Sequence, residues 1–202
     1  SLLMEQLNLP IDQLRVFGKS TIGTVIKFAG RKLEVKSIDG ANFKDLDYVI
    51  FSAGSEVASK FCKKAVSDGA FVIDMSSHFR YDKNVPLIIP EINGDELSNI
   101  DEPLIIANPN CSTAQLLMVL KPIHDICKIS SVDVATYQAV SGTGKAATQE
   151  LYNQTYIKEG YKDQNIYPKQ IAFNVIPQCD VFLENDFTKE EMKMIWETHK
   201  IL

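Results

Sequence analysis

The sequence predicts an α/β fold in which a doubly wound parallel sheet is followed by a second domain of α+β type. Two observations lead to this prediction. Short apolar, β-branched runs alternate with helical patterns in the first half, as in βαβ units. After Asn108-Pro109 the pattern changes to longer helices and polar loops. We therefore expect one domain over residues 1–108 and another over residues 109–202.

Four short runs in the first domain have the composition of buried parallel strands. They are Tyr48–Phe51, Phe71–Ile73, Leu87–Ile89 and Leu104–Ala107. The pattern over Ser55–Asp68 predicts a helix that ends at Gly69. Strand, helix and strand with short connections predict a right-handed crossover. The weaker β pattern over Thr24–Asp39 is expected at an edge of this sheet.

The second domain is predicted to mix helices with single strands. In chain order the pattern predicts an apolar helix over Ser112–Ile123, a strand over Ser131–Val140, a polar helix from about Lys145 and a strand-like run over Ile171–Ile176. Thr188, three residues before Glu191, predicts a capping box that begins a last helix. That helix continues through Trp196.

Both ends indicate a piece of a longer protein. Leu2, Leu3 and Leu7 predict the last turns of a helix that Pro10 ends, with no strand before it. The last helix reaches Leu202 without a Gly or Pro stop signal. We therefore expect both domains to be incomplete.

The composition excludes several classes of protein. The 202 residues carry 21 Lys and Arg against 26 Asp and Glu, a formal net charge of -5, which argues against nucleic-acid binding. No apolar stretch approaches the ~20 residues that span a bilayer. The four cysteines form no Cys-x-x-Cys pair. We therefore expect a reducing, cytoplasmic compartment and no metal site.

Cys111 is the first candidate for chemistry. It follows Asn108-Pro109-Asn110, which ends a strand, and it lies where Asn110 or Ser112 caps the apolar helix. A helix N-terminus favours a thiolate, and its free N–H groups stabilise an oxyanion. The alternative is that Cys111 is a small buried apolar residue. Structural roles are expected for the other cysteines, which are Cys62, Cys127 and Cys179.

Two small-residue turns are candidate ligand sites. Ser52-Ala53-Gly54 follows a predicted buried strand, at the sheet edge where α/β proteins bind nucleotides. Ser141-Gly142-Thr143-Gly144 follows the predicted strand of the second domain and offers backbone N–H groups to an anion or an amide. Each segment is equally consistent with an ordinary tight turn.

Three charged residues are candidate anion or substrate ligands. Arg80 follows a strand end, where its planar guanidinium can bind a phosphate or carboxylate. Glu190 and Lys193 lie three residues apart, on one face of the last helix. The alternatives are a solvated arginine and a surface ion pair.

These segments together resemble the aspartate-β-semialdehyde dehydrogenase family, over nearly the whole chain. The resemblance is carried first by Asn108-Pro-Asn-Cys-Ser-Thr-Ala-Gln115 and Tyr137-Gln-Ala-Val-Ser-Gly-Thr-Gly144. Five further segments occur in the family's order, namely Phe51-Ser-Ala-Gly54, Ser77-His-Phe-Arg80, Pro86-Leu-Ile-Ile-Pro-Glu91, Ile171-Ala-Phe-Asn-Val-Ile-Pro-Gln178 and Glu190-Glu-Met-Lys193. The resemblance implies a Rossmann-like NADP-binding domain followed by a catalytic and dimerisation domain.

The resemblance also implies the reaction and the site. The family reduces L-aspartyl-4-phosphate to L-aspartate-4-semialdehyde with NADPH, in lysine, threonine and methionine biosynthesis, and the reverse reaction ends in phosphorolysis. Cys111 is then the nucleophile that forms a thioester, and Gln138 positions the substrate beside it. The implied substrate and phosphate ligands are Arg80, Asn110, Glu190 and Lys193. The implied cofactor ligands are Lys19, Ser20, Ser52, Ala53, Gly54, Ser141 and Gly142. A homodimer or homotetramer is the implied assembly.

The sequence departs from the family at several places. The glycine loop that cradles the pyrophosphate is expected before Ser1, and the segment with the substrate-binding arginine and the acid/base histidine is expected after Leu202. Lys19 stands where the family usually has an arginine for the 2′-phosphate, so the charge is kept and the planar fork is lost. We therefore expect the isolated 202-residue chain to be inactive.

Two alternatives remain open. N-acetyl-γ-glutamyl-phosphate reductases use the same chemistry on a longer acyl phosphate. Their cysteine usually follows Pro-Gly, so Asn110 argues against them. The other alternative is a non-catalytic binding or assembly fragment, which the missing segments would explain.

Overall fold

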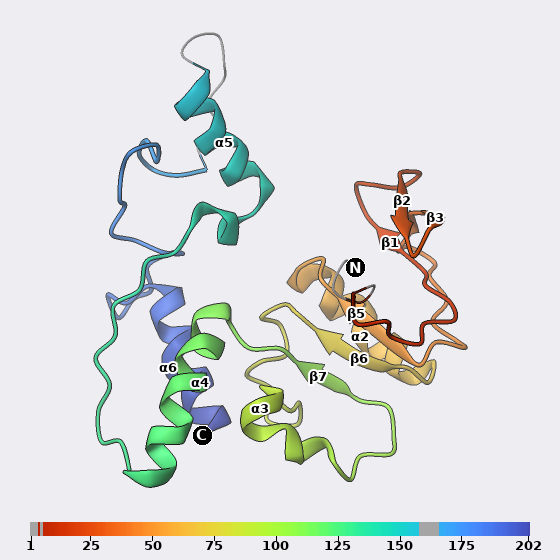
Figure 1. Ribbon diagram of the computed structural model, residues 1–202, viewed down its shortest axis with the longest axis horizontal. Helices are drawn as coiled ribbons and strands as arrows, with labels where there is room; N and C mark the ends of the chain where they lie inside the picture. Colours follow the sequence, from red (N-terminus) through yellow and green to blue (C-terminus); the bar gives the residue numbers. More distant parts are fainter. Residues whose placement is uncertain (1–3, 5, 158–165) are drawn as a thin grey trace. The chain divides into compact units, whose positions relative to one another are not determined.

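The computed structural model describes residues 4, 6–157 and 166–202, which form two compact units (Figure 1). The first unit runs to Ile88 and includes Gly94–Asn108. The second comprises Ile89–Asn93 and Pro109–Leu202. The helix expected before Pro10 falls mainly on Leu2 and Leu3, outside the described residues.

A three-stranded parallel sheet forms the centre of the first unit. Its strands are β5 (Tyr48–Phe51), β6 (Phe71–Asp74) and β7 (Ile105–Ala107), in that order across the sheet. In β5 and β6, Tyr48 is opposite Phe71 and Phe51 is opposite Asp74. The parallel sheet confirms the predicted α/β class and three of the four predicted strands.

Helix α2 (Ser55–Ser67) connects β5 to β6 and packs against both strands (Figure 1). Its apolar face is buried, with Ala58, Cys62 and Ala65 fully inaccessible to solvent. The helix ends in a Schellman motif at Gly69, whose φ of 104° is costly for a residue with a side chain. There Ala70 N–H donates to Ala65 O at 3.0 Å. The helix and its stop at Gly69 are confirmed.

The predicted strand Leu87–Ile89 is wrong except for one residue. Leu87 makes a single parallel bridge to Ala107 beside β7. Pro90 then begins the short helix α3 (Pro90–Asn93), and Asn93 Oδ1 accepts the Ile89 N–H at 2.9 Å. This side-chain contact takes the N–H group that a longer strand would pair with its neighbour.

The β residues over 24–39 do not extend the parallel sheet as predicted. β2 (Val25–Phe28) and β3 (Arg31–Glu34) form an antiparallel hairpin of their own. The hairpin turn has positive φ at both Ala29 and Gly30, which fits the right-handed twist of two strands joined by two residues. The remaining short strands, β1 (Phe17–Gly18) and β4 (Lys36–Ser37), pair in parallel with each other.

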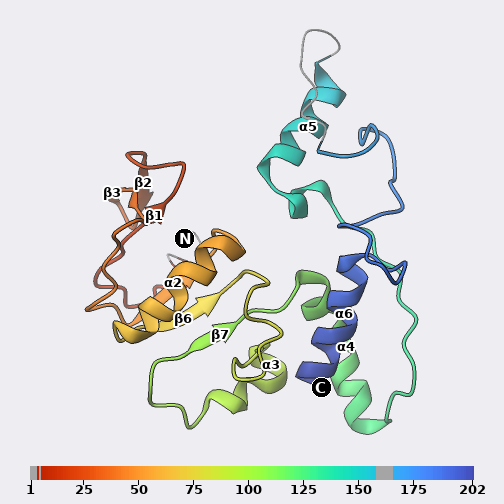
Figure 2. The same cartoon turned by 180° about the vertical axis from the view of Figure 1, so that it is seen from behind.

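Helices dominate the second unit. α4 (Cys111–Ile126) and α6 (Lys189–Ile201) lie side by side, and α3 packs against α4 (Figures 1 and 2). α5 (Lys145–Tyr156) follows the short 3₁₀ helix η2 (Val140–Thr143), and another 3₁₀ helix, η1 (Gly94–Leu97), belongs to the first unit. The capping box at the start of α6 is confirmed, since Thr188 and Glu191 satisfy each other's backbone N–H groups.

Two predicted strands of the second domain are wrong. Residues 131–139 have no regular secondary structure, no strand among the described residues pairs with them, and Tyr137 is 90% exposed. In Ile171–Ile176 the backbone is turned, with a φ of 56° at Phe173. Gln154 Oε1 of α5 accepts the N–H groups of Ile171 and Ala172, both at 3.0 Å. A side chain therefore takes the place that a neighbouring strand would hold.

None of the helices in the described part of the chain is both long and apolar enough to cross a membrane.

Candidate active site

Cys111 is the first residue of α4, and its side chain is exposed. This excludes the alternative that it is a buried apolar residue. Asn110 is the N-cap, with Oδ1 accepting the N–H groups of Ser112 at 2.8 Å and Thr113 at 3.3 Å. The backbone before the cysteine is extended (φ -60°, ψ 145°) and then turns into the helix. The thiol therefore lies at the positive end of the α4 dipole, which stabilises negative charge that develops on a bound carbonyl oxygen.

Asn110 is also tied to α6, which places two carboxylates beside it. Its Nδ2 donates to Glu190 Oε1 at 2.8 Å, and its backbone N–H donates to Glu197 Oε2 at 2.6 Å. Glu190 is 8% exposed and Glu197 is fully buried. Both carboxylates lie on the buried face of α6, because positions seven apart complete two helical turns.

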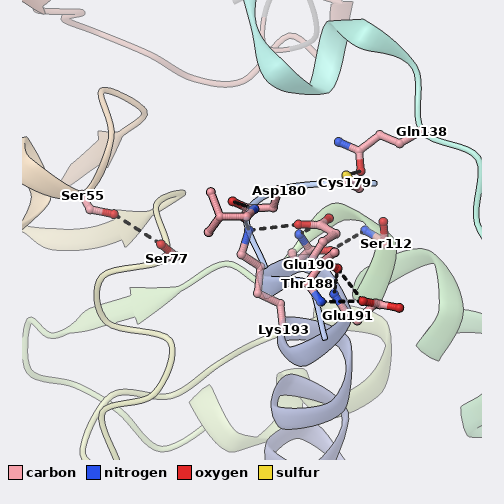
Figure 3. Close-up of polar contacts among 12 residues, drawn as sticks. Ser55, Ser77, Ser112, Gln138, Cys179, Asp180, Thr188, Glu190, Glu191 and Lys193 are labelled. Carbon is pink, nitrogen blue, oxygen red and sulfur yellow. Dashed lines mark hydrogen bonds and ion pairs between the residues drawn. The ribbon is translucent and has the colours of Figure 1, made fainter. Parts of the chain in front are cut away.

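Lys193 lies between two carboxylates of the same unit (Figure 3). Its Nζ donates to Asp180 Oδ2 at 2.7 Å and to Glu190 Oε2 at 2.9 Å. Burial alone would lower the pKa of Lys193, but the hydrogen bonds to Asp180 and Glu190 outweigh it and raise that pKa. For Asp180, burial opposes ionisation, yet the hydrogen bond from Lys193 lowers its pKa. Lys193 is therefore a fixed positive charge at neutral pH.

Gln138 is held by a second thiol. Cys179 Sγ donates to Gln138 Oε1 at 3.1 Å, and Figure 3 shows the two side chains in contact. Burial raises the pKa of Cys179, followed by the charges of Glu190 and Asp180, with Cys111 a smaller contributor. The thiol therefore stays protonated as a donor. Cys179, for which a structural role is predicted, thus contacts the candidate substrate-positioning glutamine.

The turn after Gln138 packs against its amide. Ser141 and Gly142 lie in η2, and both are exposed. A Cβ at Gly142 would overlap the Gln138 Nε2 atom. Gly144 has a φ of 110° and serves as the N-cap of α5. Glycine at position 142 thus leaves room for the Gln138 amide.

The predicted cofactor turn of the first unit is exposed at the carboxyl end of β5. Ser52, Ala53 and Gly54 form this turn, and Gly54 has a φ of 85° with open space where a Cβ would lie. Ser55 Oγ lies 3.3 Å from Ser77 Oγ, on the loop that follows β6 (Figure 3). The loops after two adjacent parallel strands therefore meet, as at nucleotide sites of α/β sheets.

Lys19 lies against the first turn of α2. Its Nζ is 3.1 Å from Glu56 Oε1, and both side chains are more than half exposed. Hydrogen bonds from Lys60 and Lys19 lower the pKa of Glu56 to about 2. Ser20 is exposed beside Lys19. A phosphate that binds Lys19 must therefore compete with Glu56.

Arg80 is not a solvated charge, since it is 7% exposed. Its Nε donates to Asn108 O at 2.8 Å, and its Nη2 donates to Met75 O at 3.3 Å. These bonds fix the chain just after β6 and just after β7. Arg80 therefore supports the backbone that leads toward Cys111 in the sequence.

Within the second unit the structure thus gathers Asn110, Gln138, Glu190 and Lys193 from separate segments around the start of α4. Sequence reasoning missed Asp180 and Glu197. The available signal for Glu197 was a carboxylate two turns beyond Glu190, on a face shared with Met194 and Ile201. Over residues 6–157 and 166–202, no three His, Cys, Asp or Glu side chains are grouped to hold a metal ion.

Comparison with known proteins identifies both units. A family model described as "Semialdehyde dehydrogenase, NAD binding domain" matches residues 1–100, and one described as "Semialdehyde dehydrogenase, dimerisation domain" matches residues 120–202. The aspartate-semialdehyde dehydrogenase of Shewanella violacea is 46% identical over 202 residues, which are 98% of this chain and 60% of that protein.

Solved structures of aspartate-semialdehyde dehydrogenases also match this chain. Aspartate semialdehyde dehydrogenase II from Vibrio cholerae is 42% identical, with a TM-score of 0.92 over 99% of this chain and 61% of that one. The same enzyme complexed with ASA is 41% identical, again with a TM-score of 0.92, over 99% of this chain and 60% of that one. The chain spans about 60% of the length of the curated relatives it matches. The chain belongs to the aspartate-semialdehyde dehydrogenase family.

Proposed function

We propose that the protein containing this chain reduces L-aspartyl-4-phosphate to L-aspartate-4-semialdehyde through a thioester on Cys111. The observation that carries the proposal is an exposed thiol at the first residue of α4, with the preceding asparagine fixed by α4 and α6. The relatives named aspartate-semialdehyde dehydrogenase support the same reaction.

In the first step the Cys111 thiolate attacks the acyl carbon of the aspartyl phosphate. The carbon–sulfur bond forms, the carbon–oxygen bond to phosphate breaks, and inorganic phosphate leaves with both electrons of that bond. The positive end of the α4 dipole stabilises the tetrahedral oxyanion in between. NADPH, when bound, supplies the hydride that reduces the thioester. Collapse of the resulting hemithioacetal releases the aldehyde and returns the sulfur to the thiolate form.

The surrounding side chains then have distinct tasks. Gln138 holds the substrate beside the sulfur, and Cys179 fixes the amide orientation by donating to Oε1. Glu190 binds the substrate amino group, for which its carboxylate is already oriented by Asn110. Lys193 and Arg80 bind phosphate, and Lys193 remains protonated for this task at neutral pH.

We assign NADP to the cofactor site of the first unit. Ser52, Ala53 and Gly54 form an exposed turn, and the space where a Cβ of Gly54 would lie is open to a ligand. Lys19 and Ser20 are assigned to the 2′-phosphate, and the further contacts come from Ser141 and Gly142. The exposed turn and the nearby lysine fit a phosphate-bearing dinucleotide.

The setting of the enzyme follows from the same proposal. It acts in the cytoplasm, where reduced thiols persist, on the route to lysine, threonine and methionine. Its assembly is a homodimer or homotetramer formed through the domain whose family model is described as a dimerisation domain.

The test is phosphate-dependent reduction of NADP by the full-length protein with aspartate-semialdehyde as substrate. We expect turnover with this aldehyde and at most weak turnover with N-acetyl-glutamate-γ-semialdehyde. Cys111→Ala is expected to abolish turnover, whereas Cys127→Ala, which removes another exposed thiol, leaves it unchanged. Retained turnover after Cys111→Ala would refute the proposal.

A further inference from the structure

Both polar groups of the Asn110 side chain and its backbone N–H form hydrogen bonds. Oδ1 caps α4, Nδ2 donates to Glu190, and the backbone N–H donates to Glu197 at 2.6 Å. The last bond reaches the peptide unit itself, one residue before Cys111. It therefore acts on the backbone that sets the position of the sulfur.

We infer that Glu197 is a positioning residue for Cys111, an inference that rests on the proposed role of Cys111 as nucleophile. Glu197 acts through the peptide unit of Asn110, whose N–H it accepts. Its carboxylate fixes the Asn110 peptide against α6, so that the cysteine enters α4 in one orientation. Displacement of a reacting group by about 1 Å costs about 100-fold in rate, so a fixed backbone at this point matters for turnover.

The burial of Glu197 argues that this contact is specific. The side chain is fully inaccessible to solvent, and transfer of a carboxylate from water to such a place is costly unless hydrogen bonds satisfy it. A short bond from N–H to a charged oxygen is among the stronger hydrogen bonds of proteins. An apolar residue would fill the same volume on α6 but would leave the Asn110 N–H without this acceptor.

The two α6 carboxylates that bind Asn110, Glu190 and Glu197, have different roles in this proposal. Glu190 also accepts from Lys193, so its carboxylate is shared with groups proposed to bind substrate and phosphate. Glu197 lies two turns further along the helix, beyond Lys193. It can therefore hold the backbone of Asn110 whether or not Glu190 changes partners during the reaction.

The test compares three replacements of Glu197 in the full-length protein. Glu197→Gln keeps an oxygen acceptor at the same length and loses the charge. Glu197→Asp keeps the charge, but its chain is one methylene shorter, which takes the oxygen out of hydrogen-bond range. Glu197→Ala removes both. Ile201→Ala is the matched control, because it removes another buried side chain from the same face of α6.

We expect kcat per titrated Cys111 to fall about 100-fold in Glu197→Ala and Glu197→Asp and less than about 5-fold in Glu197→Gln, with the KM for aspartate-semialdehyde changed less than about 3-fold. Ile201→Ala should lower the melting temperature without lowering kcat. Amide hydrogen exchange at residues 110–113 should become faster in Glu197→Ala and Glu197→Asp but not in the control.

A kcat in Glu197→Asp equal to that of wild type, or a loss in Glu197→Gln as large as in Glu197→Asp, would overturn the inference. If Glu197→Ala does not fold, the order of Gln and Asp decides. Wild-type protein without dehydrogenase turnover would instead refute the proposed function. An active wild type with no difference between Glu197→Asp and Ile201→Ala would refute only the role of Glu197.

Discussion

Replacement of Asn110 separates two roles of one side chain. Its Oδ1 caps α4, and loss of an N-cap costs about 1 kcal/mol. Its Nδ2 donates to the buried carboxylate of Glu190, and a hydrogen bond to a charged group contributes about 1.5–3 kcal/mol. Asn110→Ala removes both contacts, so we expect a loss of roughly 3 kcal/mol in the free energy of unfolding.

Two further variants divide this loss. Asn110→Ser keeps a capping oxygen and loses the bond to Glu190, so it should cost about 1.5–3 kcal/mol. Asn110→Asp also keeps the cap, but it places a carboxylate where a donor now lies 2.8 Å from Glu190 Oε1. Repulsion between the two carboxylates raises their pKa values in the folded protein. Stability of Asn110→Asp should therefore be near normal in acid and fall as the pH rises through those values.

The assay is calorimetry of the full-length protein and the three variants at pH 5 and pH 7. At about 2–4 °C for each kcal/mol, Asn110→Ala should lower the melting temperature of the affected transition by roughly 6–12 °C. Gln115→Ala, an exposed change on the same helix, serves as the control. If Asn110→Asp melts at the wild-type temperature at pH 7, Asn110 does not donate to Glu190 and the reasoning fails.

Three other outcomes are expected. Burial, with a smaller contribution from Asp74, raises the pKa of Cys62 to about 12, so iodoacetamide at pH 8 should label the exposed Cys111 but not Cys62, as read by peptide mass spectrometry. Equal labelling would contradict the fold of the first unit. Gly142→Ala should lower kcat about 10-fold by displacing the Gln138 amide, and change stability by less than about 1 kcal/mol, because the side chain that must shift is flexible. Unchanged kcat would remove Gln138 from the mechanism. Glu56→Gln should lower the Kd for NADP several-fold and leave the Kd for NAD unchanged, because Lys19 then loses its ion pair with Glu56 and can bind the 2′-phosphate. Equal effects on both cofactors would refute this assignment.

The parts of the fold that sequence predicts well are those decided locally. The apolar run Tyr48–Phe51 and the helix that ends at Gly69 carry their own periodicity and stop signal, and both occur as expected. Residues 131–140 have a strand pattern, but a strand also needs a partner, and none of the described strands pairs with it. At residues 171 and 172 the deciding contact is the Gln154 side chain, seventeen and eighteen residues away.

In the candidate site, too, sequence predicts the features that are decided locally and not those that depend on distant contacts. The Asn-Pro-Asn-Cys segment predicts a cysteine at a helix start, and Cys111 is the first residue of α4. Glu197 lies 87 residues from Asn110 in the sequence, and only the packing of α6 against α4 brings the two together. The pairing of Lys193 with Asp180 is likewise set by a loop whose path no local pattern determines.

The central claim, that Cys111 carries the acyl group, is tested most directly by trapping that group. The full-length protein is mixed with aspartate-semialdehyde and NADP without phosphate, quenched in acid and examined by peptide mass spectrometry. The account predicts one aspartyl group on the peptide containing Cys111, sensitive to hydroxylamine and lost when phosphate is added before the quench. Turnover by the same preparation with the acyl group on another residue, or with no acyl group on Cys111 in the absence of phosphate, would contradict it.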